Sequence, residues 1–499
     1  MNFKGFIGPS YKLDSVNVDC QRCVNLYPEI IESGTGKESE VAYYRTTPGL
    51  EELMDIGEGP LRLVHVDSPP KSIANPTNRT FVVSGSEVYK CIWNGTAWDV
   101  TKIGDLETSS GPVSAASSQI DLGVTVFVDG VHSYLYWKYI DDGLPVENFD
   151  LFSVFGYVEV ENAIQVIWLD GYFIYIQANS GSFFVSDWNS FNVDPLSFAV
   201  SEGDPDKVVA EIANYRDLIM FNERSTEVYV NTGNADFPYD RVQGGFIETG
   251  CLASQSVAKI DGYVFWLGRD QFGQGKIYAI QGLSPQRIST HAIEQAIRKY
   301  ANPQKATAYT YQQDGHSFYV INFAEATWCY DLSTRLWHER AYTNNGQLQR
   351  HRAESVVFFP YLNLHFASDY ESGQIYKLDP NVLTDDGQCI TRMRIAPHIS
   401  NSLKNVFYNS LQIDMETGVG LNGIVQGHDP KVILQWSDDG GHTWSKEKYA
   451  SIGKLGNYKT RAIFRRLGMA RDLVFKMKIT DPVKVNITGA QLELERGAS

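Results

Sequence analysis

The sequence predicts an all-β protein: a β-propeller with an N-terminal extended arm and a C-terminal antiparallel β-sandwich. Three observations predict this fold class. A short aromatic strand recurs along the chain, Asp-Gly turns precede apolar strands, and longer alternating strands follow about residue 390. Short strands that recur about every 40–50 residues are typical of propellers, in which each repeat forms one four-stranded blade. The repeats predict about seven blades, within a range of six to eight.

The recurring strand has a small or polar residue, then one or two apolar or aromatic residues, with a Tyr or Phe as its anchor. Successive anchors are 47, 48, 45, 49, 41 and 57 residues apart. The anchors are Tyr89, Tyr136, Phe184, Tyr229, Tyr278, Tyr319 and Tyr376. One such unit cannot bury both faces of its sheet, so the units are expected to stack around an axis. An unrelated series of antiparallel hairpins, as in a large sandwich, remains the alternative.

Asp-Gly pairs provide a second, independent mark of the repeat. They are Asp129-Gly130, Asp170-Gly171, Asp261-Gly262 and Asp314-Gly315. Asp-Gly supplies the positive φ angles that tight hairpins need, so each pair predicts a strand–turn–strand unit.

The domain organisation follows from where these repeats begin and end. Residues 1–60 contain no anchor, and Pro28 and Pro48 exclude a long helix there, so we expect an arm with strand pieces. Residues 61–385 are expected to form the propeller, with one inserted helix near 290–301.

The expected helix begins after Thr290, whose side chain can cap it. Ile293, Ile297 and Tyr300 follow at i, i+4 and i+7, which predicts one buried helix face.

From about residue 390 the aromatic anchors stop. The strands lengthen and alternate, as at 431–436 and 473–479. This pattern is typical of an antiparallel sandwich, so residues 390–499 are expected to form a C-terminal β-sandwich platform.

The charge excludes a protein that grips nucleic acid through its phosphates. The 43 Lys and Arg residues stand against 59 Asp and Glu residues, which gives a formal net charge of −16. A DNA clamp needs the opposite sign or a strong basic patch. The cluster at 350–352 is short and followed by Glu354, so we expect a solvated turn there.

Six cysteines are scattered over 499 residues, too few for a disulfide scaffold. Cys20 and Cys23 form a lone C-x-x-C without a second ligand pair, so reduced structural thiols are favoured over a zinc site, and no cofactor is expected. No run of about 18 apolar residues predicts a membrane span. The N-terminus lacks an apolar signal segment, which favours synthesis in a cytoplasm.

The sharpest local motif resembles the Asp-box, S-x-D-x-G-x-T-W, of sialidases and other propeller glycosidases. Its residues are Ser437, Asp439, Gly441, Thr443 and Trp444. The motif is a hairpin turn in which the Asp accepts backbone N–H groups, glycine takes a positive φ, and Trp packs beneath. It is structural even in those enzymes, so it is weak evidence for a glycosidase.

No catalytic constellation can be assembled from the sequence. It contains no H-E-x-x-H, G-x-S-x-G or P-loop motif, and the spacing suggests no sialidase-like set of arginines, Tyr and acids. We therefore expect no enzyme, no catalytic residues and no metal site. A propeller-type carbohydrate-binding or glycoside-cleaving protein, such as a depolymerase, is the alternative.

Several stretches together resemble one known family, in the same order along the whole chain. They lie at 24–28, 44–50, 183–229, 285–290 and 436–492. The positions that carry the match best are Tyr27, Pro28, Pro48, Gly49, Asp194, Pro195, Glu202, Pro205, Asp206, Arg216 and Asp217. The chain thereby resembles the packaged-DNA-stabilisation, or tail hub (nozzle), proteins of short-tailed bacteriophages.

The resemblance implies a structural virion protein, assembled in the bacterial host cytoplasm and located in the tail. It implies a homo-hexameric ring below the portal and adaptor rings, which continues the DNA channel and helps retain packaged DNA. Tail fibres or spikes and a plug or needle are the further partners that it implies. The acidic composition adds the expectation that DNA passes through the channel without tight binding, and this chain is not expected to insert into a membrane.

Overall fold

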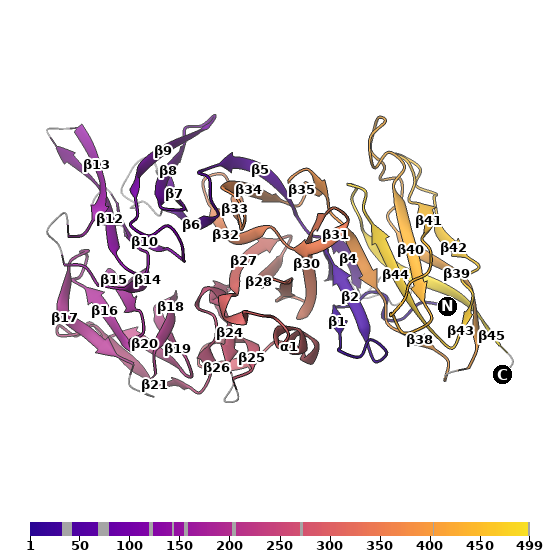
Figure 1. Cartoon of the computed structure of the whole chain (residues 1–499), viewed down its shortest axis with the longest axis horizontal. Coiled ribbons are helices and arrows are strands. Elements are labelled where there is room, and N and C mark those ends of the chain that lie inside the picture. The colour runs from indigo at the N-terminus through magenta and orange to yellow at the C-terminus, as the bar shows by residue number, and fades with distance from the viewer. Residues whose placement is uncertain are drawn as a thin grey trace.

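The computed structural model of the chain describes residues 1–31, 42–67, 79–118, 123–141, 144–153, 158–201, 206–269, 273–402 and 404–497. The molecule is elongated, with a ring of β-sheets at one end and a β-sandwich at the other (Figure 1). Both chain termini lie at the sandwich end (Figure 1).

The ring is built from sheets that follow one another along the chain, each with its strands mostly in sequence order. The first sheet contains β6 (Leu61–Val66), β7 (Arg79–Ser84), β8 (Glu87–Trp93) and β9 (Trp98–Asp105). The second contains β10 (Ser114–Ser118), β11 (Val124–Val128), β12 (Ser133–Asp141) and β13 (Leu144–Leu151). The third contains β14 (Ala163–Leu169), β15 (Tyr172–Gln177), β16 (Ser182–Ser186) and β17 (Val193–Val200). The fourth contains β18 (Val208–Asn214), β19 (Asp217–Asn222), β20 (Thr226–Asn231) and β21 (Tyr239–Ile247).

The second half of the ring continues the same plan. The fifth sheet contains β22 (Gly250–Cys251), β23 (Ala258–Ile260), β24 (Tyr263–Arg269), β25 (Gly275–Gln281) and β26 (Ser284–Arg287). The sixth contains β27 (Thr307–Gln313), β28 (His316–Asn322), β29 (Thr327–Asp331) and β30 (Leu336–Asn344), with β31 (Gln347–Arg350) paired to β30. The seventh contains β32 (Ala353–Phe359), β33 (Leu364–Asp369), β34 (Gln374–Asp379) and β5 (Gly49–Asp55), extended by β35 (Thr384–Asp385) and β36 (Gln388–Cys389). β32 contacts β6, so the last sheet of the ring meets the first.

Two features of the repeat differ from the expectation. Six anchors lie in the third strand of their sheet, but Tyr319 lies in the second strand, β28, and the third strand, β29, supplies Tyr330. With Tyr330 as the anchor, the irregular steps of 41 and 57 residues become 52 and 46. Tyr319 fitted the anchor pattern although it lies in the second strand, because every residue of β28 is buried and aromatic side chains are frequent in such a strand.

The Asp-Gly turns are of two kinds. At Asp170, Asp261 and Asp314 both the Asp and the following glycine have positive φ, as in a two-residue hairpin. At Asp129 only the glycine does. The Asp129 carboxylate instead accepts the N–H groups of Val131 and His132 at 3.0 and 2.8 Å, which forms an Asx-type turn between β11 and β12.

The ring is closed by a strand from the other end of the sequence. β5, from the last part of the expected arm, pairs antiparallel with β34 and completes the seventh sheet. Gly49 starts β5 where no side chain fits, because a Cβ there would lie 2.4 Å from the Thr384 carbonyl oxygen. The blade that ends the repeat is therefore held by residues that precede the first blade.

One sheet continues from the propeller into the sandwich, and we call it the shared sheet. Its strand order is β27-β28-β29-β30-β2-β37-β44-β40-β41, with β1 and β38 paired at its sides. The strands beyond β30 are β1 (Tyr11–Lys12), β2 (Cys20–Val24), β37 (Arg392–Ile395), β38 (Ile399–Ser400), β40 (Lys431–Ser437), β41 (Lys448–Ser451) and β44 (Asp472–Ile479). β2 pairs parallel with β30 and antiparallel with β37, so a strand of the arm joins the two domains by backbone hydrogen bonds.

The second sheet of the sandwich also uses the arm. Its order is β3-β4-β45-β39-β42, with β43 paired to β39. These strands are β3 (Leu26–Ile30), β4 (Ala42–Thr46), β39 (Val406–Met415), β42 (Ala462–Arg465), β43 (Met469–Ala470) and β45 (Ile487–Arg496). Phe3 and Phe6 are buried in the sandwich core, and the Phe3 N–H donates to the Ala490 carbonyl oxygen at 2.8 Å.

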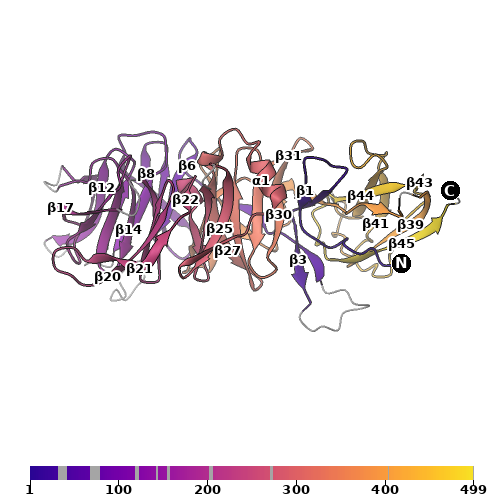
Figure 2. The same cartoon turned by 90° about the horizontal axis from the view of Figure 1, so that it is seen from below.

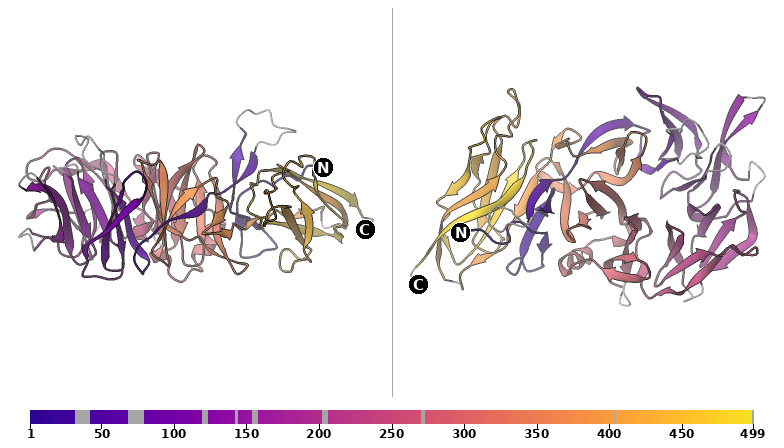
Figure 3. Two further views of the ribbon diagram at one scale, coloured as in Figure 1. Left: turned by 90° about the horizontal axis from the view of Figure 1, so that it is seen from above. Right: turned by 180° about the vertical axis from the view of Figure 1, so that it is seen from behind.

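The β3–β4 hairpin projects from one side of the molecule (Figure 2). The sandwich stands beside the ring when the molecule is seen from behind (Figure 3).

The inserted helix is α1 (His291–Ile297), and the short 3-10 turn η3 (Pro303–Lys305) follows it. A further 3-10 turn, η2 (Ser254–Ser256), precedes β23. Thr290 caps it by accepting the Ile293 N–H, and Ile293 and Ile297 are buried, as the sequence predicts. Among the described residues, no helix has the length and apolar character needed to span a membrane.

Arg394, a buried arginine of β37, holds the arm in place. Its guanidinium donates to the carbonyl oxygens of Phe6, Pro9 and Gly5 at 2.8, 2.8 and 2.9 Å. It also donates to Gln21 Oε1 at 2.6 Å. One fully buried side chain therefore clamps residues 5–9 to the shared sheet.

We expect Arg394→Ala to lower the free energy of unfolding by about 3 kcal/mol, because it leaves several buried carbonyl groups without a donor. Urea denaturation followed by intrinsic fluorescence measures this change. Arg471→Ala, at an exposed arginine nearby in the sandwich, is the control and should leave stability unchanged. Equal stability of the two variants would contradict the clamp.

Candidate functional site

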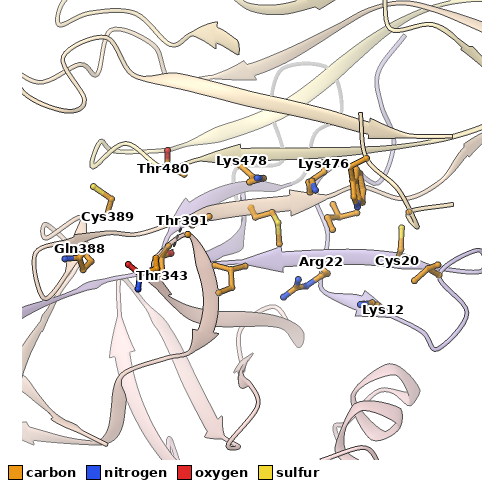
Figure 4. Close-up of a pocket in the computed structure, with 18 of the residues that line it drawn as sticks. Lys12, Cys20, Arg22, Thr343, Gln388, Cys389, Thr391, Lys476, Lys478 and Thr480 are labelled. Atoms are coloured by element: carbon orange, nitrogen blue, oxygen red, sulfur yellow. Dashed lines mark hydrogen bonds between the residues drawn. The ribbon is translucent and has the colours of Figure 1, made fainter. Parts of the chain in front are cut away.

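A cavity of about 700 Å³ lies where the shared sheet passes from propeller to sandwich (Figure 4). We call it the junction cavity. Its lining comes from β1 and β2 of the arm, the β30–β31 hairpin, β36, β37, β44 and the Asp-box turn. Segments from both ends and the middle of the sequence thus meet at one site.

Basic side chains converge on this cavity although the chain as a whole is acidic. They are Lys12, Arg22, Lys476 and Lys478. Arg22 lies opposite Ile395, which lies opposite Lys476, so these three share one face of the sheet. Strands lie about 4.8 Å apart, which places the Arg22 and Lys476 backbones about 10 Å apart.

Two of the cations have carboxylate partners inside the chain. Arg22 Nε lies 3.0 Å from Glu339 Oε1, and Lys478 Nζ lies 3.2 Å from Glu447 Oε1. Lys476 instead lies over the Trp444 ring, 4.0 Å from its centroid. Burial, followed by the nearby Lys478, lowers the pKa of Lys476 to about 8. A negative charge near Lys476 would favour its protonated form and so offset both causes of the lowered pKa.

The Asp-box turn forms one wall of the junction cavity. Asp439 accepts the Thr443 N–H at 2.9 Å and the hydroxyls of Ser437 and Thr443, each at 2.6 Å. These hydrogen bonds, that from Ser437 first, hold the pKa of the Asp439 carboxyl well below its usual range. Gly441 has a φ of 102°, and Trp444 packs against the cavity.

The Asp-box turn packs on the arm. A Cβ at Gly440 would lie 2.1 Å from Asn17 Oδ1, and one at Gly441 would lie 3.4 Å from Cys20 Sγ. This contact favours a structural use of the motif, in which it fixes the arm against the sandwich.

The positions that carried the family resemblance do not converge on one site. Tyr27 is buried, with its ring 5.2 Å from those of His316 and Phe318. Pro28 lies buried in β3, and the Pro48 carbonyl accepts a hydrogen bond from the buried Arg340 at 2.9 Å.

The described central positions lie at or just before strand starts in the third and fourth sheets. The Asp194 carboxylate accepts the Leu196 N–H at 2.9 Å, and Pro195 is exposed in β17. Asp206 accepts the Arg224 N–H at 2.5 Å. Arg216 lies 3.3 Å from Asp170, and Asp217 starts β19. Glu202 and Pro205 lie outside the described residues.

The cluster at 350–352 is not a solvated turn: His351 is fully buried, and Arg352 donates to Asp369, whose carboxylate is also buried.

The six cysteines are free, and Cys23 is buried with its thiol directed at the Leu26 carbonyl. In the described part of the chain, no group of three His, Cys, Asp or Glu side chains is placed to hold a metal ion.

Sequence reasoning missed the junction cavity itself. Lys476 and Lys478 alternate along one strand, which the sequence shows, but nothing in it places Arg22 two strands away. Only the pairing of β2 with β37 brings these side chains together.

Family models match almost the whole chain. Residues 20–383 match the model described as "Bacteriophage P22 Gp10, beta-propeller", and residues 391–495 match "Bacteriophage P22 Gp10, beta-sandwich". The propeller model thus begins within the arm and includes β5. No curated protein matches the sequence significantly.

The chain has weak similarity to two solved structures. YCF48 from Cyanidioschyzon merolae has 11% sequence identity and a TM-score of 0.41, over 66% of this chain and 99% of that one. The Myceliophteria thermophila Cps50 (Swd1) β-propeller domain has 9% identity and a TM-score of 0.40, over 66% and 99% of the two chains. The fold assignment rests on the two family models.

We expect Asp439→Ala to lower the Tm and to shift Trp444 fluorescence, because the turn loses the acceptor of its backbone and hydroxyl hydrogen bonds. Differential scanning calorimetry and emission spectra measure these changes. Asp438→Ala removes the adjacent exposed acid and should leave both unchanged. Equal effects of the two substitutions would show that the Asp-box hydrogen bonds do not hold the turn.

Proposed function

We propose that the chain forms the hub or nozzle ring of a phage tail. The chain belongs to the bacteriophage P22 Gp10 family and is therefore a structural tail protein of short-tailed phages. In this proposal six copies form a ring below the portal and adaptor rings. The ring continues the DNA channel, helps to retain packaged DNA, and carries fibres or spikes and a plug or needle. The role is non-enzymatic.

The observation that carries the proposal is the match of both family models, in order, to a propeller and a sandwich joined by one shared sheet. Backbone hydrogen bonds across β30, β2, β37 and β44 resist relative movement of the two domains better than a flexible linker does. The join therefore supports the proposal that the chain is a rigid structural part of the tail.

The residue ranges proposed for each part are 1–60 for the arm, 61–385 for the propeller and 390–499 for the sandwich. The arm pairs within its own chain at β2, β4 and β5, and its β3–β4 hairpin also projects from the body (Figure 2). We assign subunit and adaptor contacts to this hairpin and the sandwich, because the propeller satisfies most of its own strand edges.

Charge supports passage of DNA without adhesion. Six copies of a chain with charge −16 carry about −96 in one ring. Lysine or arginine rings would hold DNA by a salt-dependent free energy, whereas a neutral or acidic wall lets it slide. Retention then comes from a plug or a closed gate.

Imaging assembled tails tests the ring directly. Phage particles that carry a tag at the C-terminus of this chain should show six labels in one plane below the portal by averaged electron microscopy. Particles tagged on a capsid protein are the control. Labels confined to peripheral fibres, or present in three copies, would contradict the hub assignment.

A gel-shift titration tests passage without binding. The purified protein should leave free duplex DNA unshifted at ordinary salt, with little change on adding more, because a chain with a net charge of −16 repels the phosphates. A basic DNA-binding protein of similar mass is the positive control. Tight, salt-sensitive binding would instead favour a basic-lined clamp.

A further inference from the structure

The lining of the junction cavity contains cations but no acids (Figure 4). Four of its residues are Lys or Arg and none is Asp or Glu, although the whole chain has 59 acids against 43 cations. Composition alone would place more acids than cations around such a cavity. The excess of cations therefore marks the cavity as a site that attracts a negatively charged group.

Two of these cations have no carboxylate partner in the described part of the chain. Lys12 and Lys476 form no ion pair there, whereas Lys478 is paired with Glu447. The side chains of that pair are 26% and 35% exposed, and such exposed pairs contribute little to stability. A carboxylate from outside can therefore reach Lys476 and Lys478 without breaking a buried ion pair.

The spacing of these two lysines indicates a ligand with two negative groups. Lys476 and Lys478 alternate along β44, so their side chains leave one face of the strand about 6.8 Å apart. Ile395 and Met393 pair with them on β37 and form an apolar floor beside them. An extended peptide has the same repeat as the strand. Acidic residues at i and i+2 of such a peptide place one carboxylate against each lysine.

The segment between β3 and β4, residues 32–41, lies outside the described residues and has this sequence pattern. It contains Glu32, Glu38 and Glu40 against the single cation Lys37. Glu38 and Glu40 are at i and i+2. The same pattern occurs elsewhere in the chain, at Glu493 and Glu495 among others, but those two lie within β45, whose backbone is paired with β39.

The strands that flank this segment are directed toward a neighbouring molecule rather than toward the cavity of their own chain. The β3–β4 hairpin projects from one side of the molecule, whereas β1 and β31, which border the cavity, lie toward the opposite side (Figure 2). A contact between a hairpin on one side and a cavity on the other joins two different surfaces. Repeated contacts of this heterologous kind close into a ring when the rotation between copies permits it.

We propose that the junction cavity is the docking site for residues 32–41 of a second copy of this chain, with that copy's Glu38 and Glu40 against Lys476 and Lys478. The proposal rests on the proposed tail ring, and it names the two surfaces through which neighbouring subunits meet. Lys12 adds to the attraction from the arm side of the cavity. Burial, followed by Lys478, lowers the pKa of Lys476 to about 8, and a docked carboxylate favours its ammonium form.

Fluorescence polarisation of a labelled peptide with the sequence of residues 31–42 measures this docking. The receptor is the full-length Glu38→Gln/Glu40→Gln protein, whose own segment lacks the carboxylates that would compete. We expect saturable binding that weakens as salt is added, because the contacting charges are partly exposed. The peptide that carries Glu38→Gln and Glu40→Gln should bind about tenfold more weakly, since each such ion pair contributes up to about fivefold.

Receptor variants test the cavity side of the contact. Lys476→Gln should weaken binding of the native peptide about fivefold. Lys454→Gln, at an exposed lysine of the sandwich outside the cavity, is the matched control and should leave the affinity unchanged. A peptide with Glu38→Lys and Glu40→Lys should bind a Lys476→Glu/Lys478→Glu receptor more tightly than it binds the parent receptor, which requires direct contact.

Absence of saturable binding, or equal binding of the native and Gln-substituted peptides, would overturn the proposal. An affinity unchanged by Lys476→Gln would also overturn it. Displacement of the peptide by lower concentrations of succinate or of a short duplex DNA would assign the cavity to another anion and so contradict the docking.

The outcome is separate from that of the imaged tails. Peptide docking without six labels in one plane would contradict the hub ring alone, whereas six labels without peptide docking would contradict only this contact.

Discussion

The pairing of β2 with both β30 and β37 is the constraint on which the rest of the structure depends. A strand edge with unpaired N–H and C=O groups is costly to bury. β2 satisfies the edge of the sixth propeller sheet on one side and that of the sandwich on the other. The two domains therefore share one hydrogen-bonded sheet, and their relative orientation follows from its twist rather than from a linker.

The same arm performs three further tasks. Residues before β2 pack Phe3 and Phe6 into the sandwich core, β3 and β4 extend its second sheet, and β5 closes the propeller. Arg394 ties the arm to β37 with hydrogen bonds to neutral oxygens. Because each task uses backbone or buried polar groups, the arm is an integral part of both domains.

The junction cavity is a consequence of this construction. Where β2, β37 and β44 cross between domains, the Asp-box turn and the β30–β31 hairpin border the sheet face without filling it. Cations from strands of the arm and of the sandwich then lie on that face, although the chain has a net charge of −16. Local charge in this protein is set by strand pairing, and the total charge by composition, so an acidic tail component can contain a basic site.

The sequence by itself determined the properties that are local or periodic. The repeat of aromatic strands predicted the propeller, and the longer alternating strands predicted the sandwich. Thr290 predicted the helix start and the Asp-box residues predicted their turn, because each of these two features depends on neighbours within a few positions. Tertiary structure decided what depends on long-range pairing. It placed Tyr330 rather than Tyr319 in the third strand, assigned β5 to the last blade, buried His351, and brought Arg22 and Lys476 to one face of the shared sheet. One sequence carries no record of which strand edges meet, because backbone hydrogen bonds are the same for every residue except proline.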